Sequence, residues 1–369
     1  MLDNIPFELQ SEIMKRLPAE SLIRFRSVCK SWKSMIHSSD FIAGYRGQQH
    51  LIVRYKDAVV NHDYKYVSIV VDDDDDTFPL QKVYVTDPQL VVNMLKCYTT
   101  VASSHGLLCL FGKTDGAIIW NPSIRKAVAV GVPNMANSEI YRTVLGFGVC
   151  CKTNDPKIVK INYIIQWTDI EDVAYIPWQV EVFTLTTGAW RSLSNNLPRK
   201  SIRFGWDQVV VDGCLYWLAS VDDTFRSDCL IVSFDLTSEE FREVNLPSSL
   251  AHSCCNLLVD KLRESLAVIE PNIEANKLVY HVWMMEDGVP RSFEKLYTIS
   301  SHLPCVSIVR ICGFRKTGEP LIELHTRPGS LNCILADYDP YSKFISNVGI
   351  IGRYRSFFVY TYMETLLLL

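Results

Sequence analysis

Hydrophobic positions follow two different periods along the chain, and the change falls near residue 48. Residues 1–47 contain only two glycines, Gly44 and Gly47, and their apolar residues recur at the spacing of amphipathic helices. From residue 48 onward, short runs rich in Val, Ile, Tyr, Phe and Trp alternate with turn residues, as in β-strands. The pattern predicts an α+β chain, with a small helical domain over residues 1–47 and a large all-β domain over residues 48–369.

Three helices are predicted in the first segment. One covers residues 6–17, where proline suits the first turn and Pro18 prevents simple continuation. A second covers about residues 20–36 with a break near Ser27, and Ser38-Ser39-Asp40 has the composition of a cap for a short helix through Tyr45. Helices this short bury little by themselves, so they either dock on the rest of the chain as a plain N-terminal bundle or cover apolar surface on another protein.

A repeated unit of short strands is visible in the β segment. Five copies each contain an aromatic residue near a strand end, with separations of 63, 51, 49 and 55 residues: Trp120, Phe183, Phe234, Trp283 and Tyr338. A period near 50 with several strands per unit is typical of a kelch-like β-propeller, and 322 residues allow about six blades. The run from Phe357 to Tyr362 is a candidate for the strand that completes the ring, and a pair of β-sandwiches is the alternative.

Composition and charge exclude several classes of protein. Hydrophobic residues are 48% and charged residues 21%, a globular balance, and the net charge of −4 gives no field for nucleic acid or an anionic membrane. Residues 1–50 carry seven Lys/Arg and five Asp/Glu, which suits an acidic partner of this segment. The start lacks the features of a secretory signal, and no apolar run reaches the roughly 18–20 residues of a membrane span.

Metal and cofactor sites are not predicted. No two of the twelve cysteines have CxxC spacing, so we expect reduced core thiols, no zinc and no disulfides, in a protein of the cytoplasm and/or nucleus. The acidic run from Asp72 to Asp76 lacks the alternating ligands and glycine turn of a calcium loop and is predicted to be a solvated loop.

The sequence IPFELQSEIMKRLPAESLIRFRSVCKSWKSMIHSSDFI, residues 5–42, closely resembles the F-box. The resemblance implies docking on a Skp-type adaptor, which bridges to a cullin scaffold with its RING protein and a ubiquitin-conjugating enzyme. Burial of several of its apolar side chains would supply roughly 1.5–3 kcal/mol each of gross transfer free energy. The residues expected at that adaptor, some of which must instead form the module's own core, are Ile5, Pro6, Leu9, Ile13, Leu17, Pro18, Leu22, Phe25, Val28, Cys29 and Trp32.

The β segment is similar to the F-box-associated domain of large plant families. The similarity is carried by Gly106-Leu107-Leu108 with Trp120-Asn121-Pro122, by the runs 182–191 and 235–247, and by the tail 362–366. It implies a domain that recruits a target protein, while the F-box protein itself performs no covalent chemistry.

Enzyme motifs are missing: the sequence contains no GxSxG, Walker loop, HExxH or GxGxxG. Gly146-Phe147-Gly148 is predicted to be a strand bulge or turn, and Ser103-Ser104-His105 a turn before Gly106. Asp337 and Asp339 could pair as catalytic carboxylates, but their Tyr-Asp-Pro context favours a turn.

Three hypotheses follow for the function. The first is a non-catalytic substrate receptor of a Skp–cullin–F-box ubiquitin ligase. The second is an F-box scaffold that binds the adaptor outside the ligase. The third is a propeller enzyme or sugar-binding module, which a convergent cluster of carboxylates or histidines near the propeller centre would favour.

Overall fold

The structure is a computed structural model of the 369-residue chain. It describes residues 5–45, 47–58, 64–70, 81–85, 98–112, 116–133, 141–164, 178–194, 202–223, 226–252, 257–286, 292–301, 306–325, 327 and 330–368. The acidic run 72–76 lies outside these residues. The chain divides into two compact units, which are Met1–Val53 with Lys65–Val132 and Tyr360–Leu369, and Arg54–Tyr64 with Pro133–Val359.

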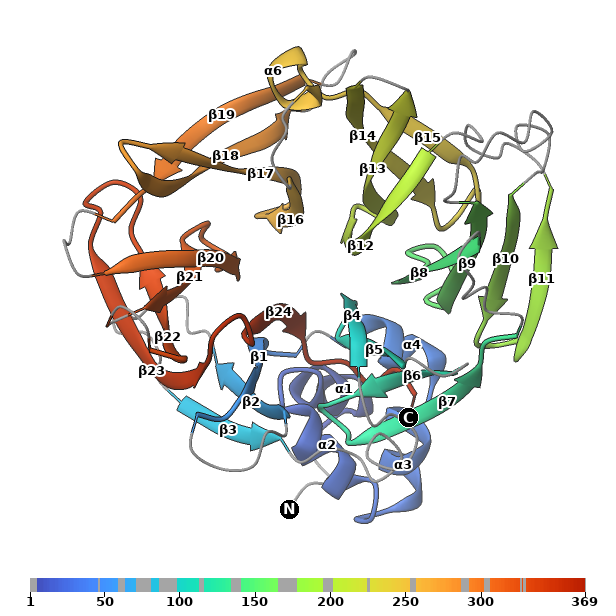
Figure 1. The fold of residues 1–369 in the computed structure, drawn as a ribbon. Helices are drawn as coiled ribbons and strands as arrows, with labels where there is room; N and C mark the ends of the chain where they lie inside the picture. Colours follow the sequence, from blue (N-terminus) through green and yellow to red (C-terminus); the bar gives the residue numbers. More distant parts are fainter. Residues whose placement is uncertain are drawn as a thin grey trace. The chain divides into compact units, whose positions relative to one another are not determined.

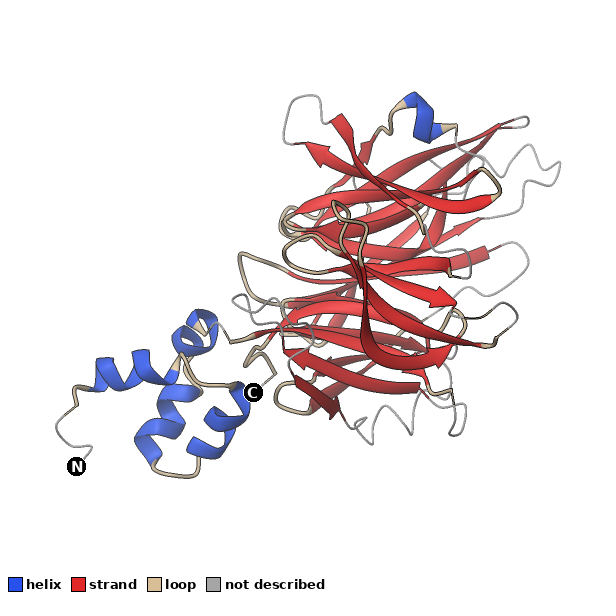
Figure 2. Ribbon diagram, turned by 90° about the vertical axis from the view of Figure 1, so that its left-hand side faces the viewer, coloured by secondary structure: helices blue, strands red, loops and turns tan. Residues whose placement is uncertain are grey.

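Four short helices form the N-terminal module: α1 (Phe7–Met14), α2 (Ala19–Phe25), α3 (Lys30–Ile36) and α4 (Ser39–Gly44) (Figure 2). The predicted break near Ser27 is confirmed, because α2 and α3 are separate helices. Cys29 caps α3, with its Sγ accepting from Trp32 N at 3.5 Å, and Ser38 caps α4, with its Oγ accepting from Phe41 N at 3.3 Å. The first helix is shorter than predicted and ends before Leu17.

The rest of the chain forms six antiparallel four-stranded sheets, the blades of a β-propeller, which confirms the predicted fold class (Figure 1). A short helix, α6 (Ser248–Ala251), connects blades 4 and 5. The strands, in sheet order, are: blade 1, β24 (Phe358–Met363), β1 (Gln49–Lys56), β2 (Tyr64–Val70) and β3 (Gln81–Val85); blade 2, β4 (Tyr98–Ser104), β5 (Leu107–Gly112), β6 (Gly116–Asn121) and β7 (Lys126–Gly131); blade 3, β11 (Ala189–Leu193), β10 (Gln179–Thr184), β9 (Pro156–Ile164) and β8 (Tyr141–Val149); blade 4, β12 (Ile202–Val211), β13 (Cys214–Asp223), β14 (Arg226–Asp235) and β15 (Phe241–Val244); blade 5, β16 (Leu258–Leu262), β17 (Ser265–Glu274), β18 (Lys277–Glu286) and β19 (Ser292–Ile299); blade 6, β20 (Ser307–Phe314), β21 (Pro320–His325), β22 (Asn332–Tyr338) and β23 (Ile345–Arg353).

The strand near the C-terminus belongs to the first blade. β24 pairs with β1, so blade 1 combines strands from both ends of the β segment, as the sequence predicted for residues 357–362. Such sharing removes an unpaired edge that an open array of sheets would present.

The five repeat aromatics all lie on the third strand of their blades, counted along the chain. Trp120, Phe183, Phe234 and Tyr338 each face the residue seven positions ahead on the fourth strand, for example Phe183 opposite Trp190. Trp283 instead faces Lys295, because it lies three residues before the end of β18, whereas the other four lie at or next to the ends of their strands, and because the register shifts next to it.

Each hydrophobic cluster between blades 3 and 6 takes side chains from two adjacent blades. One joins blades 3 and 4 around Trp217 and Phe234, a second joins blades 4 and 5, and a third joins blades 5 and 6 around Tyr280 and Tyr338. Successive side chains of a strand point to opposite faces of the sheet, so each blade can pack against both neighbours.

The Gly146-Phe147-Gly148 segment corrects a prediction, because it is neither a bulge nor a turn. It lies in β8, which pairs with β9 without a register shift. A Cβ at Gly146 would lie 2.2 Å from Trp217 Cζ2, and one at Gly148 would lie 2.5 Å from Leu236 Cδ1. Both glycines therefore permit blade 4 to pack closely on blade 3.

Replacement of Gly146 by alanine is expected to lower the free energy of unfolding by about 1–3 kcal/mol, because Trp217 is fully buried and cannot move aside. Urea unfolding followed by tryptophan fluorescence measures the effect. Gly131→Ala is the matched control, since nothing lies within 4 Å of its Cβ position. Equal stability of the two variants would show that close packing does not require Gly146.

Candidate functional site

The helical module has a sealed core and an open outer face. Its core cluster contains Met14, Ala19, Leu22, Met35, Ile36, Phe41, Tyr45 and, from the C-terminal tail, Leu366. Leu9 and Ile13 lie one turn apart on α1, and their exposed fractions are 55% and 53%. We call these two residues the α1 stripe. Exposed apolar side chains at helical spacing suit burial against a partner.

The residues predicted at the adaptor fall into three groups. Leu22 is completely buried, so it supports the helices from inside the module. Ile5, Leu17, Phe25 and Trp32 are half-buried, and the other six are exposed, namely Pro6, Leu9, Ile13, Pro18, Val28 and Cys29. Leu17 therefore does not continue the α1 stripe, because α1 ends before it and its side chain packs against the core.

Trp32 takes part in the module's own packing. Its ring centroid lies 5.5 Å from that of Phe25, and its Nε1 donates to Gln10 Oε1 at 2.8 Å. These contacts connect α1, α2 and α3. Trp32 is available to a partner only through its exposed edge.

Phe7 is an exposed apolar residue that the sequence reasoning missed, with 47% of its surface accessible. The apolar stripe predicted from the sequence runs through positions 9, 13 and 17. Phe7 lies on a different side of the helix, two turns before the buried Met14. Its place directly after Pro6, in the first turn of an amphipathic helix, is the signal that could have identified it.

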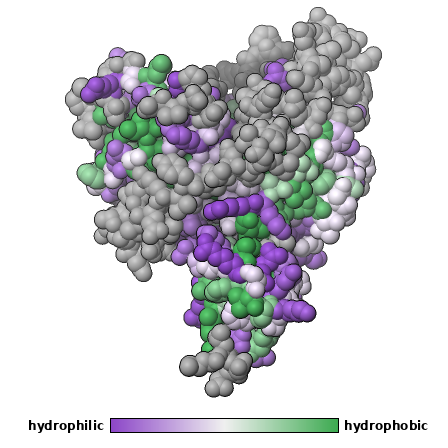
Figure 3. All heavy atoms as spheres, turned by 90° about the horizontal axis from the view of Figure 1, so that it is seen from below, coloured by the Kyte–Doolittle hydropathy of each residue, from purple (hydrophilic) through white to green (hydrophobic). Residues whose placement is uncertain are grey.

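Charged side chains surround the exposed apolar residues of the module (Figure 3). The pairs Lys15–Glu12, at 2.9 Å, and Arg24–Glu20, at 2.7 Å, are exposed, so solvent screens them and they contribute little to the stability of the helices. Lys30 and Lys33 are exposed as well. The basic excess predicted for this segment is thus available at its surface.

The C-terminal tail holds the helical module. Glu364 Oε2 accepts hydrogen bonds from the backbone N–H of Ala19 at 3.2 Å and from Tyr45 Oη at 3.1 Å, while Glu364 Oε1 lies 3.6 Å from His50 Nε2. Burial acts to raise the pKa of Glu364, but hydrogen bonds from His50, Ala19 and Tyr45 outweigh it and lower the pKa below its usual value. The carboxylate therefore stays charged and paired at neutral pH.

Blade 2 fixes the end of the same tail. Asn121 Nδ2 donates to the carbonyl oxygens of Thr365 at 2.9 Å and Leu367 at 2.7 Å. Leu366, between these two anchors, is fully buried in the core of the helical module, where Ile124 of blade 2 also packs. The tail is thus part of the core of the helical module, although it follows the last strand.

Three ionisable side chains lie on the first strands of adjacent blades: Asp207 on β12, Asp260 on β16 and Arg310 on β20 (Figure 1). Asp207 is exposed to solvent, but the protein atoms around it still desolvate the carboxyl and raise its pKa, and the Arg310 charge partly opposes this. The pKa of Asp260 is raised to about 7. Burial is the main cause, and the charge of Asp207 acts in the same direction, while a backbone hydrogen bond from Lys261 acts in the opposite one. Arg310 is bound to Glu323 at 3.0 Å.

Asp260→Asn is expected to stabilise the protein at pH 8, with most of this advantage lost at pH 5. The folded carboxyl keeps a proton up to about pH 7, whereas the unfolded one releases it near pH 3.8, so ionisation opposes folding increasingly across that window. Melting temperatures report the difference at about 2–4 °C per kcal/mol. The exposed Glu294→Gln serves as control, and a gain for Asp260→Asn that is equal at both pH values would contradict the assignment.

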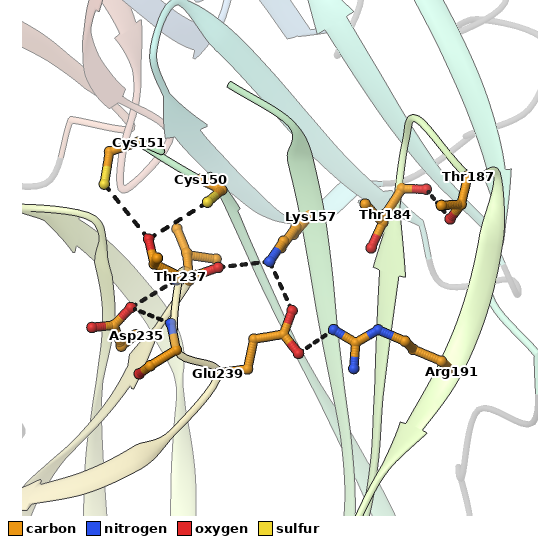
Figure 4. A network of polar contacts seen from close by, with 11 residues as sticks. Cys150, Cys151, Lys157, Thr184, Thr187, Arg191, Asp235, Thr237 and Glu239 are labelled. Atoms are coloured by element: carbon orange, nitrogen blue, oxygen red, sulfur yellow. Dashed lines mark hydrogen bonds and ion pairs between the residues drawn. The ribbon is translucent and has the colours of Figure 1, made fainter. Parts of the chain in front are cut away.

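A polar network joins blades 3 and 4 (Figure 4). Lys157 Nζ donates to Leu236 O and Glu239 Oε1, both at 2.7 Å, and Arg191 also pairs with Glu239. Beside it is a hollow of about 420 Å³, lined by Thr153, Asp155, Lys157, Thr184, Thr186, Arg191 and Glu239. Lys157 and Arg191 belong to blade 3, and Glu239, with which both pair, lies between β14 and β15 of blade 4. We therefore interpret this network as a connection between the two blades.

The prediction of turns at the remaining candidate residues holds only in part, because Ser103 and Ser104 belong to β4 and Asp337 belongs to β22. His105 and Gly106 have φ values of 47° and 75° between β4 and β5, where a Cβ on Gly106 would meet Met363 O. Asp339 accepts from Tyr341 N at 2.8 Å in the β22–β23 turn. Asp337 differs, because it pairs with Arg315 at 3.3 Å.

Within the described residues, no three His, Cys, Asp or Glu side chains gather as metal ligands, and no helix is long and apolar enough to cross a membrane. Eight described cysteines are free. Two of them, Cys29 and Cys151, are exposed and so depart from the prediction of core thiols.

Comparison with known families agrees with this architecture. The helical segment matches the F-box domain over residues 2–43, and the β segment matches the F-box associated beta propeller domain over residues 48–317. The chain therefore belongs to the family of F-box proteins with an F-box-associated β-propeller.

Its relatives are Arabidopsis thaliana proteins of similar length. The chain is 25% identical to F-box/kelch-repeat protein At3g23880 over 311 residues, which are 80% of this chain and 79% of that protein. It is 27% identical to putative F-box/kelch-repeat protein At1g12170 over 305 residues, 80% of each chain.

Proposed function

We propose that this protein is the substrate receptor of a Skp–cullin–F-box ubiquitin ligase in the cytoplasm and/or nucleus. The helical module docks on a Skp-type adaptor, and the propeller binds the protein to be ubiquitinated without catalysing a reaction. The observation that carries the proposal is the α1 stripe. Leu9 and Ile13 stay more than half exposed beside the likewise exposed Phe7 and Val28, while a separate set of apolar side chains forms the module's core.

Reconstitution tests the proposal. The full chain is co-expressed with a Skp-type adaptor and then mixed with a cullin–RING core. We expect one complex containing all components on size-exclusion chromatography. A complex that contains the adaptor but excludes the cullin would instead support an F-box scaffold outside the ligase, and absence of adaptor binding would refute both.

One observation favours a ligand-binding propeller as the second candidate. Asp207 and Asp260 lie on neighbouring first strands and interact electrostatically, and paired carboxylates of this kind are what the hypothesis of a propeller enzyme or sugar-binding module requires. A thermal-shift screen with lysine, arginine and polyamines separates the candidates. Stabilisation that Asp207→Asn removes would support the second candidate.

A further inference from the structure

Blade 6 displays an apolar and cationic surface at the β21–β22 turn and the end of β23. It consists of His325, Arg327, Leu331, Tyr354 and Arg355, and we call it the Tyr354 surface. Leu331 is 73% exposed and Tyr354 44%. Tyr354 N donates to Leu331 O at 2.8 Å, just beyond the Asn332–Arg353 pair, so the two residues face each other across the end of the strands.

Tyr354 is held in place by its neighbours. The His325 ring stacks on it with centroids 5.0 Å apart, and the Arg355 guanidinium carbon lies 5.4 Å from its ring centre. The backbone N–H of Arg355 donates to the buried carboxylate of Glu323, which fixes the chain at this point. An aromatic ring restrained in this way loses little conformational entropy when a partner binds, and Tyr and Arg are frequent anchors of protein interfaces.

The charge of this surface is opposite to that of the whole chain. Arg327 and Arg355 are exposed, and the half-buried Arg353 is the last residue of β23. The nearby acidic residues are Glu323, whose carboxylate is fully buried and bound to Arg310, and the half-buried Asp57, whose backbone pairs with that of Gly352. Because the chain carries a net charge of −4, a group of arginines around exposed apolar side chains is complementary to an acidic partner.

We propose that the Tyr354 surface binds an acidic peptide segment of the target that contains a leucine or aromatic side chain. This inference rests on the proposed function, in which the propeller recruits the target. The apolar side chain would pack on Leu331 and Tyr354, and flanking carboxylates would pair with Arg327 and Arg355. Exposed Leu331 favours a protein segment over a nucleic acid, whose backbone would use only the arginines.

Fluorescence polarisation of the full chain tests the proposal with three labelled twelve-residue peptides. The first alternates Asp or Glu with Leu or Phe, the second has Lys and Arg in place of the acids, and the third has Ser and Gly in place of Leu and Phe. We expect the first to bind at least about tenfold more tightly than either of the others. Its affinity should fall as salt concentration rises.

Two double variants locate the binding. Arg327→Glu with Arg355→Glu, and Leu331→Ser with Tyr354→Ser, should each weaken binding of the acidic apolar peptide by at least about tenfold. Lys277→Glu with Lys295→Glu, two exposed positions on blade 5, is the charge-matched control and should leave it unchanged.

Three results would overturn the proposal: no binding of the first peptide, equal binding of the basic peptide, or unchanged affinity in both surface variants. The proposal would also be overturned if the chain associates with itself and the surface variants abolish this association, because a second copy would then occupy the surface. Adaptor binding is measured on the same variants. If the native chain does not bind the adaptor, the proposed ligase function is refuted. If it binds the adaptor but not the acidic apolar peptide, only the proposal for the Tyr354 surface is refuted.

Discussion

A chain carrying Leu9→Asp and Ile13→Asp is expected to lose binding to a Skp-type adaptor, with Kd at least about 100-fold higher. Docking would bury two unpaired carboxylates, and each costs several kcal/mol when no partner compensates it. Both side chains are more than half exposed in the free protein, so the substitutions should leave the fold intact. Isothermal titration with the purified adaptor measures the loss, and circular dichroism checks the fold.

The control places the same change on another exposed apolar side chain. Ile273→Asp alters a 73% exposed residue of β17 and should bind the adaptor normally. Adaptor affinity that persists in the Leu9 and Ile13 variant would show that the α1 stripe is not the docking surface. Phe7→Ser extends the test to a residue that sequence reasoning missed.

Glu364→Ala is expected to release the helical module from the tail. The change removes an acceptor from Ala19 N and Tyr45 Oη and a negative charge beside His50. Hydrogen bonds to charged groups contribute about 1.5–3 kcal/mol each, so the local free energy of opening should fall by about 2–4 kcal/mol. Hydrogen exchange should accelerate in α2 and α4 and stay unchanged in blades 3–6.

Glu294→Ala, which truncates an exposed carboxylate of β19, is the matched control. Glu364→Gln should be intermediate, because its amide oxygen can still accept from Ala19. Unchanged exchange in Glu364→Ala would mean that Leu366 and Asn121 alone fix the tail. The pKa of Glu364 is lowered, so its contribution should persist at neutral pH and be lost as the pH falls through that lowered value.

The structure supplies the physical reason for several outcomes of the sequence reasoning, both confirmed and wrong. The second helix was predicted with a break, and Cys29 completes that break by capping α3. Trp283 looked like the other repeat aromatics because it occurs at a similar spacing, but its place three residues before the end of β18 gives it a different partner. Gly146 and Gly148 looked like a bulge or turn, because the sequence does not show that side chains of blade 4 leave no room for a Cβ at these positions.

The sequence by itself determined the two-part architecture, the approximate period of the β repeat and the amphipathic character of α1, because periodicity and turn residues act over a few positions. The structure fixed the number of blades at six. Tertiary structure decided which apolar residues of the module face outward, since that depends on what the remaining helices bury. It also decided the Asp207–Asp260 pair and the Glu364 contact with Ala19, which joins residues 345 positions apart. Contacts between distant segments leave no local pattern, so only the folded chain reveals them.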